Sequence, residues 1–244
     1  MRTSLRVRER RHAEREARAR RIQAAARRVF ADHGVNGATM EMIARQAKVA
    51  VGTIYLHFSS RDEVYLSLSI ESAERLRTRY LEVKSRGLDP LEELRALATG
   101  YIDHLRGWCD PFLSSQSVNH AQLRKRLHCA VEIRKFDRLV NLCSELFTLF
   151  EGTVRRACDA GLIANPLGPT KATALVWAIL NGVFVLTCDS EFLRDVTGLD
   201  PEHFVEQIFE SHLMTVRIGK EGAKPQAETL AGGKPVCGWE RRCD

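Results

Sequence analysis

Apolar residues recur along most of this chain at intervals of three and four, which is the period of one face of an α-helix. Runs that alternate strictly between apolar and polar residues, as in a half-buried strand, are scarce, and aromatic residues make up only 7% of the 244 residues. This pattern excludes a β-sandwich or barrel and predicts an all-α fold. The predicted long helices span residues 20–33, 62–86, 90–105, 122–160, 170–189 and 201–218.

Two shorter helical segments lie between the first and second of these helices. Thr39 is a good N-cap for a helix that continues to about Gln46, and residues 48–50 form a three-residue turn. A second short helix follows over residues 51–58, with Ile54 and Phe58 directed into the core. Two short helices joined in this way form a helix-turn-helix, whose second helix enters the major groove of DNA. The residues predicted to face outward are Ala50, Val51, Thr53, Tyr55 and His57.

The stretch from about Glu16 to Leu76 resembles the tetracycline-repressor (TetR/AcrR) family of bacterial transcription regulators. The resemblance rests on the helix of residues 22–30 and on the strings GATMEMIA, VGTIYLHF and SSRDEV, and it covers a quarter of the chain. It implies an N-terminal three-helix DNA-binding domain over residues 16–76, with the helix-turn-helix at about 39–58. It also implies a C-terminal helical domain for effector binding and dimerisation over residues 77–218.

The resemblance further implies roles for single residues. Thr39 matches the family residue that caps its helix and meets a phosphate, and Tyr55 and His57 match phosphate contacts. Arg61 matches the family's usual basic contact at the start of the fourth helix, and Thr53 matches a base or phosphate contact.

The helix-turn-helix departs from the family pattern at two places. Lys48 stands where the family often has glycine, and a non-glycine residue with positive φ is uncommon. Ala50 and Val51 stand where many members have Ser or Thr and Lys or Arg, so a helix cap and a positive charge are lost. We therefore expect base reading to rely on Thr53 and on apolar contacts with thymine methyl groups.

Positive charge is concentrated at the N-terminus. Residues 1–30 contain eleven arginines and three glutamates, whereas residues 31–244 contain 26 basic and 28 acidic residues. A clustered positive end indicates a polyanionic partner, either nucleic acid or an anionic membrane face. We expect residues 1–15 to be a basic flexible arm, either solvated without a role or in contact with DNA. Residues 219–244 are rich in Gly, Pro and Lys and lack a period, which predicts a disordered tail.

The helix predicted over residues 170–189 is apolar on most of its circumference, so it must be buried in a core or against a partner chain. Asn181 in this helix needs a polar partner and is a candidate for fixing the register of a dimer seam. The family builds an effector pocket in this domain, and the alternative is that the same side chains are plain core. The candidate pocket residues are Tyr101, Trp108, Phe112, His120, Phe136, Asn141, Phe147, Trp177 and Asn181.

Several function classes find no support. The chain has no Gly-rich phosphate loop, no HExxH, no GxSxG and no paired metal ligands, so neither an enzyme nor a metal or cofactor site is expected. The longest apolar run, over residues 172–186, is shorter than the roughly 20 residues that a membrane span needs. Seven cysteines without CxxC spacing or a secretion signal indicate reduced thiols, and a cytoplasmic location is expected.

We expect a transcriptional repressor that binds an inverted-repeat DNA operator as a homodimer paired through its last two helices. A small apolar effector bound among the core helices would release it. The alternatives are a constitutive regulator without an effector, a basic architectural protein that binds DNA without sequence preference, and a helical protein anchored to a membrane surface by residues 1–30.

Overall fold

The computed structural model describes residues 2–107, 120–163, 168–188, 190–200 and 204. Within these residues the chain forms nine α-helices and no strand, so the all-α prediction is confirmed. The helices are α1 (Arg2–Gly37), α2 (Met40–Ala47), α3 (Val51–Tyr55), α4 (Arg61–Ser85), α5 (Pro90–Gly107), α6 (His120–Arg126), α7 (Ala130–Asp159), α8 (Pro169–Cys188) and α9 (Ser190–Thr197).

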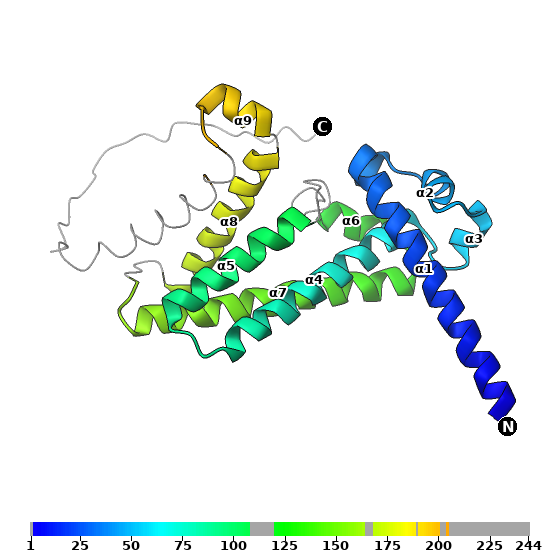
Figure 1. Ribbon diagram of the computed structural model, residues 1–244, viewed down its shortest axis with the longest axis horizontal. Helices are drawn as coiled ribbons and strands as arrows, with labels where there is room; N and C mark the ends of the chain where they lie inside the picture. The colour runs from blue at the N-terminus through cyan, green and yellow to red at the C-terminus, as the bar shows by residue number, and fades with distance from the viewer. Residues whose placement is uncertain (1, 108–119, 164–167, 189, 201–203, 205–244) are drawn as a thin grey trace.

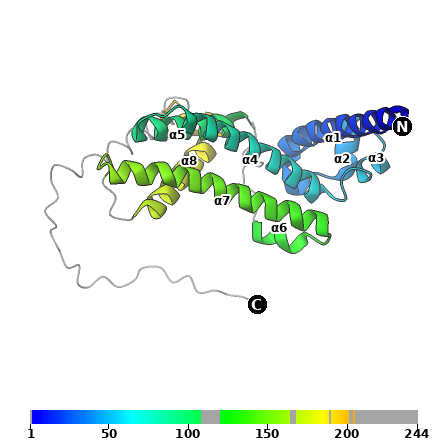
Figure 2. The same cartoon turned by 90° about the horizontal axis from the view of Figure 1, so that it is seen from below.

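The helices form a head and a body. The head consists of α1, α2 and α3, and the body consists of α4 to α9 (Figure 1). In the body, the long helices α4 and α7 run side by side, with α5 and α8 packed against them, and α6 lies beside the start of α7 (Figure 2). Because α4 also packs on α1, this helix belongs to both parts.

A continuous apolar core joins the head to the body. In the head it contains the fully buried Ile22, Phe30 and Ile54. At the start of α4 the five residues 62–66 are all buried, because the head covers one side of the helix and the body covers the other. The core then continues along α4 into the body as far as Phe184. Burying a large apolar side chain contributes about 1.5–3 kcal/mol, so this core holds head and body together.

A buried carboxylate joins three helices at the far end of the body. Glu93 of α5 is 3% exposed and accepts hydrogen bonds from Lys84 of α4 (2.8 Å) and from Thr153 and Arg156 of α7 (2.6 Å each). Burial alone would raise the pKa of Glu93, but these hydrogen bonds outweigh it and hold the pKa below its ordinary value. A buried carboxylate of this kind is stable in the interior only while its hydrogen-bond partners remain in place, because an unpaired buried charge is strongly destabilising.

The structure corrects the expected conformation of the N-terminal arm. Residues 2–15 are helical and continuous with the rest of α1, and the helical φ/ψ angles break off at Gly34 (φ 68°), as its position in the sequence predicts. Arg, Glu and Ala favour helix, and the pairs Arg10–Glu14 and Arg20–Glu16 stabilise it at i, i+4 spacing.

The helix predicted over residues 122–160 is also corrected, because it is broken into α6 and α7. Cys129 is the N-cap of α7, and its Sγ accepts a hydrogen bond from the Glu132 backbone N–H (3.4 Å). The Glu132 carboxylate in turn accepts from the backbone N–H groups of His128 and Cys129 (3.1 and 3.3 Å). This capping box satisfies backbone donors that a continuous helix would have bonded internally.

Two further features of the helices differ from the predictions. The second helix of the helix-turn-helix ends at Tyr55 instead of Phe58, and α9 was not predicted. The helix predicted over residues 201–218 and the tail over residues 219–244 lie outside the described residues.

The half-buried His104 predicts a loss of stability at mildly acid pH. His104 of α5 bonds with Ser72 of α4 (2.9 Å between Nε2 and Oγ), and burial, with smaller effects of Arg75 and Arg79, lowers its pKa from 6.5 to about 4. Between about pH 6.5 and 4, His104 is therefore protonated in the unfolded chain but neutral in the folded chain. Stability should be complete above pH 6.5 and fall by up to about 2 kcal/mol between pH 7 and 5.

Urea unfolding at several pH values measures this effect. The His104→Gln variant should show a flatter pH dependence than wild type, whereas the same change at the exposed His33 should leave the dependence intact. Equal slopes for wild type and His104→Gln would contradict the assignment.

Candidate DNA interface and body cavity

The turn between α2 and α3 has the geometry of a helix-turn-helix. Thr39 caps α2, with its Oγ1 accepting a hydrogen bond from the Met42 backbone N–H (3.2 Å), as predicted. Lys48 ends α2 in the left-handed conformation (φ 54°), which a non-glycine residue adopts at a cost in free energy. Ile54 and Phe58 are buried, which fixes α3 against the rest of the head.

The outer face of α3 is largely apolar. Ala50 begins the helix without a side-chain cap, and Tyr55 is 52% exposed. Leu56 is 71% exposed and was not predicted to face outward, because the sequence pattern carried the helix three residues too far. Val51, Thr53 and His57 are half-buried. The predicted reading residues therefore share one end of the head with an additional exposed leucine.

The Arg61 side chain does not project freely into solvent. Its Nη1 donates to the carbonyl oxygen of Asn36 (2.8 Å), and its Nη2 forms an ion pair with the adjacent Asp62 (3.3 Å). These bonds tie the start of α4 to the end of α1. A phosphate contact by Arg61 stays a prediction, and the guanidinium already has a positioning role without DNA.

Arginines of α1 reach the ends of both short helices. Arg15 donates to the carbonyl oxygen of Leu56 after α3 (3.4 Å), and Arg21 donates to that of Ala47 at the end of α2 (3.3 Å). Cations at the carbonyl end of a helix are favourable. Burial lowers the pKa of His57, and the charges of Arg15 and Arg18 lower it further, so His57 is neutral at pH 7.

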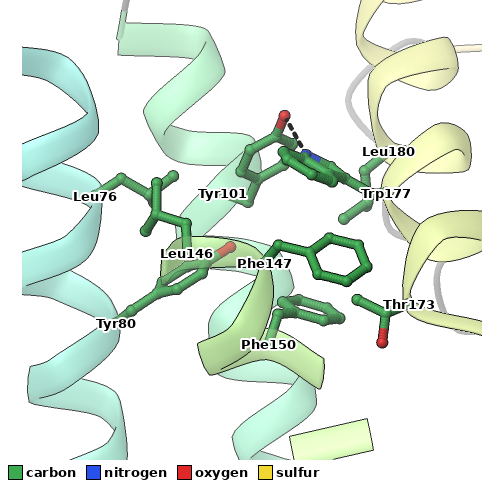
Figure 3. A pocket seen from close by; sticks show the side chains of 9 residues that line it. All are labelled: Leu76, Tyr80, Tyr101, Leu146, Phe147, Phe150, Thr173, Trp177 and Leu180. Carbon is green, nitrogen blue, oxygen red and sulfur yellow. Dashed lines mark hydrogen bonds between the residues drawn. The ribbon is translucent and has the colours of Figure 1, made fainter. Parts of the chain in front are cut away.

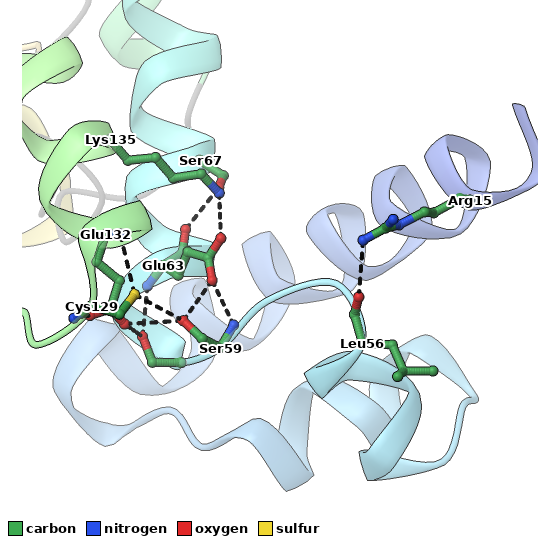
Figure 4. Close-up of polar contacts among 9 residues, drawn as sticks. Arg15, Leu56, Ser59, Glu63, Ser67, Cys129, Glu132 and Lys135 are labelled. Carbon is green, nitrogen blue, oxygen red and sulfur yellow. Dashed lines mark hydrogen bonds and ion pairs between the residues drawn. The ribbon is translucent and has the colours of Figure 1, made fainter. Parts of the chain in front are cut away.

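A polar cluster connects the head to the body, and we call it the junction: Ser59, Ser60, Asp62, Glu63, Arg126, Glu132 and Lys135. The Glu63 carboxylate of α4 accepts from the Ser59 backbone N–H (2.6 Å) and hydroxyl (2.7 Å) and from Lys135 of α7 (2.6 Å) (Figure 4). Burial alone would raise the pKa of Glu63, but the bonds from Lys135 and Ser59 lower it below its ordinary value.

The junction has a second and a third contact across the same boundary. The Ser60 hydroxyl, which also caps α4, donates to Glu132 of α7. Arg126 of α6 donates to Asp62 (3.0 Å). The start of α4 is therefore held by charged groups from both α6 and α7, and it cannot shift without breaking or exchanging these bonds.

A cavity lies in the body between α4, α5, α7 and α8 (Figure 3). Its free volume is about 30 Å³, close to the space of a single water molecule, and its walls are almost entirely apolar. The residues that line it are Leu76, Tyr80, Tyr101, Leu146, Phe147, Phe150, Thr173, Trp177 and Leu180.

Polar atoms beside the cavity form a closed set of hydrogen bonds. Trp177 Nε1 donates to the Tyr101 hydroxyl (2.8 Å), which donates to Asn181 Oδ1 (2.9 Å). Asn181 Nδ2 donates back to the Trp177 carbonyl oxygen (2.7 Å). Asn181 is 5% exposed, so its partner is in its own chain, which corrects the prediction that it fixes a dimer seam.

The structure brings together some of the predicted pocket residues. Tyr101, Phe147 and Trp177 line the cavity, and Asn181 lies beside it. Phe136 is buried elsewhere, under the Arg124 guanidinium, and Asn141 is exposed in a groove between α4 and α7. Trp108, Phe112 and the side chain of His120 lie outside the described residues. Six further residues that line the cavity were not predicted: Leu76, Tyr80, Leu146, Phe150, Thr173 and Leu180.

Comparisons with known proteins bear on the head and on the whole fold. Residues 22–68 match the model of the bacterial regulatory proteins, tetR family. The transcriptional repressor BepR of Brucella suis is 26% identical over 180 residues, which cover 73% of this chain and 82% of BepR. A tetR-family regulatory protein from Rhodococcus RHA1 superposes with a TM-score of 0.65 at 18% identity, over 82% of this chain and 96% of the other. Over residues 22–68 the chain therefore carries a helix-turn-helix domain of the tetR-family type, and over most of its length it is similar to TetR-family transcriptional regulators.

A third similar protein is the regulator AibR, whose structure was solved with isovaleryl coenzyme A and operator DNA. It superposes with a TM-score of 0.59 at 19% identity, over 82% of this chain and 98% of AibR. At such identities the likeness shows the shared fold. The family whose model matches residues 22–68 and the relative BepR are both described as transcriptional regulators. No helix in the part that the structure describes has the length and apolarity to cross a bilayer.

Helix α8 has one covered side and one open side. Thr173, Val176 and Leu180 are buried against the body. Leu175 is 44% exposed, and the small residues Ala174, Ala178 and Gly182 are exposed on the same side of the helix. A single chain therefore does not bury this helix on all sides in the way that the sequence predicted, and one side of its apolar surface faces outward.

The hydrogen bonds beside the cavity predict a measurable contribution to stability. Tyr101→Phe should lower the free energy of unfolding by about 1–3 kcal/mol, because it leaves Asn181 Oδ1 and Trp177 Nε1 without their hydrogen-bond partner while preserving the ring. Urea unfolding measures the change. The same substitution at the exposed Tyr55 should cost almost nothing, and equal effects for the two variants would contradict the closed set of bonds.

Proposed function

We propose that this regulator is a homodimeric, sequence-specific repressor whose α3 helices enter successive major grooves of an inverted-repeat operator. The observation that carries the proposal is the outer face of α3. Tyr55 at the end of α3 and Leu56 directly after it are exposed although Ile54 beside them is fully buried, and the head keeps them there at a cost in exposed apolar area. An exposed apolar face beside Arg15, Arg18 and Lys48 fits the methyl groups and phosphates of a DNA major groove.

Base reading and positioning fall to different residues. Thr53 and the apolar Ala50, Val51 and Leu56 are placed to meet base edges, where thymine methyl groups supply apolar contacts. Thr39, Tyr55 and His57 are the proposed phosphate contacts, and Arg61 supports them by fixing the start of α4. With so few polar groups on α3, we expect specificity for A·T base pairs within each half-site.

The open side of α8 is the proposed dimer interface. Exposed small residues at i, i+4 and i+8 allow two helices to approach closely, and Leu175 adds apolar area. A two-fold pair of chains places two α3 helices symmetrically, which an inverted repeat matches. The second helix that the sequence assigns to this interface, over residues 201–218, lies outside the described residues.

A small apolar effector is proposed to bind in the body cavity and release the operator. The 30 Å³ cavity is closed around its own side chains, so a ligand must push its walls apart, and α4 supplies two of them, Leu76 and Tyr80. Because the other end of α4 carries the junction, the open cavity and the DNA-bound head would favour different positions of α4. Release then follows from differential affinity for the two arrangements. That AibR was solved with both an acyl coenzyme A and operator DNA supports this type of regulation.

Selection of bound sequences from random DNA tests the proposal. Wild-type protein should enrich an inverted repeat, and Thr53→Ala should relax the preference at one position of each half-site with a loss of about 1–3 kcal/mol there. Tyr55→Phe, the matched control on the same helix, should weaken all sequences about equally, because phosphate contacts carry no sequence information.

Two outcomes of this selection would contradict the proposal. A flat binding profile would favour the architectural, non-specific alternative that the basic N-terminus motivates. Enriched sites without dyad symmetry would exclude the two-fold arrangement of reading helices.

A further inference from the structure

The N-terminal half of α1 carries four arginines on one face, and we call them the arginine stripe: Arg8, Arg11, Arg15 and Arg18. Their spacing of three and four residues places them in one line along the helix. The same line continues into the buried Ile22, Ala26 and Val29, which pack into the head. The arginine stripe therefore lies on the side of α1 that faces the other helices of the head.

The arginine stripe is left without acidic partners in the described part of the chain. Two glutamates of this segment pair with arginines outside the stripe, Glu14 with Arg10 (3.5 Å) and Glu16 with Arg20 (3.8 Å). The hydrogen bond of Arg15 goes to a carbonyl oxygen, not to a carboxylate. Like charges at i, i+3 and i, i+4 repel one another, so the free protein keeps this face at a cost that a polyanion would remove.

The arginine stripe begins beside α3 and extends past it. Arg15 donates to the carbonyl oxygen of Leu56, directly after α3 (Figure 4). Besides burial, the charges of Arg15 and Arg18 lower the pKa of His57. Beyond Arg15, α1 projects past α3 without covering helices (Figure 1). Arg11 and Arg8 thus continue the proposed DNA-contacting end of the head by about one and two helical turns.

We propose that the arginine stripe binds the phosphates of the double-stranded DNA that flanks the half-site read by α3. The inference rests on the proposed function, since α3 must first be in a major groove. From Arg8 to Arg18 the helix rises about 15 Å, over which one strand of B-DNA carries about four phosphates. Four guanidiniums on one rigid helix match that length and charge, and the helix keeps them in register with α3.

A membrane surface fits the same segment less well. Helices that lie in a membrane interface need a broad apolar face opposite their charges. Residues 8–18 offer only Ala13 and Ala17 as apolar residues, and both are exposed. The segment therefore has the positive charge but lacks the apolar surface that a helix buries in a lipid bilayer.

Salt-dependent binding of two duplexes tests the proposal. One duplex contains the selected operator alone, and the other adds about ten base pairs on each side. The stripe variant is Arg8→Gln/Arg11→Gln/Arg18→Gln, which leaves Arg15 and its contact with α3 in place. The matched control is Arg10→Gln/Arg20→Gln/Arg28→Gln, which removes the same charge from other faces of α1. Glutamine preserves helix propensity, and circular dichroism checks that all variants fold.

Wild type should bind the longer duplex at least tenfold more tightly than the shorter one, and the stripe variant should lose that gain. The slope of log affinity against log salt should fall by about 3 per protomer, at 0.9 for each lost phosphate contact. The control should keep the gain and most of the slope, and the order of preferred sequences should be unchanged in both variants.

Equal behaviour of stripe and control variants on the longer duplex would overturn the proposal. So would unchanged DNA binding by the stripe variant together with loss of binding to phosphatidylserine vesicles, which would assign the arginines to a membrane. If wild type shows no preference for a dyad-symmetric duplex, the proposed function fails. The comparison of stripe and control variants on that duplex then still decides whether the arginine stripe contacts DNA.

Discussion

Glu63 of α4 is in contact with Lys135 of α7 at the start of α4, where this helix packs against both the head and the body. Glu63 is 5% exposed, and its two oxygens are shared among Ser59, at the end of the head, and Lys135. Removing one member of a buried, hydrogen-bonded pair costs about 3–5 kcal/mol, because the remaining charge stays desolvated. The position of the head therefore depends on the position of α7, because α4 is bonded to Ser59 on one side and to Lys135 on the other.

Helix α4 connects this junction to the cavity. Its first turns are buried between head and body, and further along it places Leu76 and Tyr80 in the wall of the cavity. Under the proposed function, a ligand that pushes on Leu76 would displace α4 as a unit and Glu63 with it, because densely packed interiors transmit strain. The closed hydrogen bonds of Tyr101, Trp177 and Asn181 hold the opposite wall in one arrangement. One wall of the cavity is therefore held by hydrogen bonds, and the other belongs to the helix that also packs on the head.

The sequence predicted those parts of the structure that depend on local pattern. Apolar periodicity gives the helices, and Thr39, the turn at Lys48 and the buried Ile54 identify the helix-turn-helix, because each feature acts within a few residues. Asn181 was recognised as needing a partner, but that partner, Tyr101, lies 80 residues away. The break at Cys129 was missed because its capping box is made by side chains that a continuous apolar period conceals. Likewise, Arg61 and the cavity residues Tyr80 and Thr173 acquire their neighbours only when α4, α7 and α8 pack together.

Hydrogen exchange of the full chain with and without its selected operator tests the coupling between head and cavity most directly, since coupling is reciprocal and needs no known effector. The account predicts that operator binding slows exchange in α3 and also changes exchange in α7 near Lys135 and in the cavity-lining part of α8. In Glu63→Gln the change in α3 should persist while the change in α8 is lost. Glu145→Gln, a control that removes an exposed α4–α7 ion pair with Arg77, should behave as wild type. Exchange in α8 that is identical with and without operator in the wild-type protein would contradict the account.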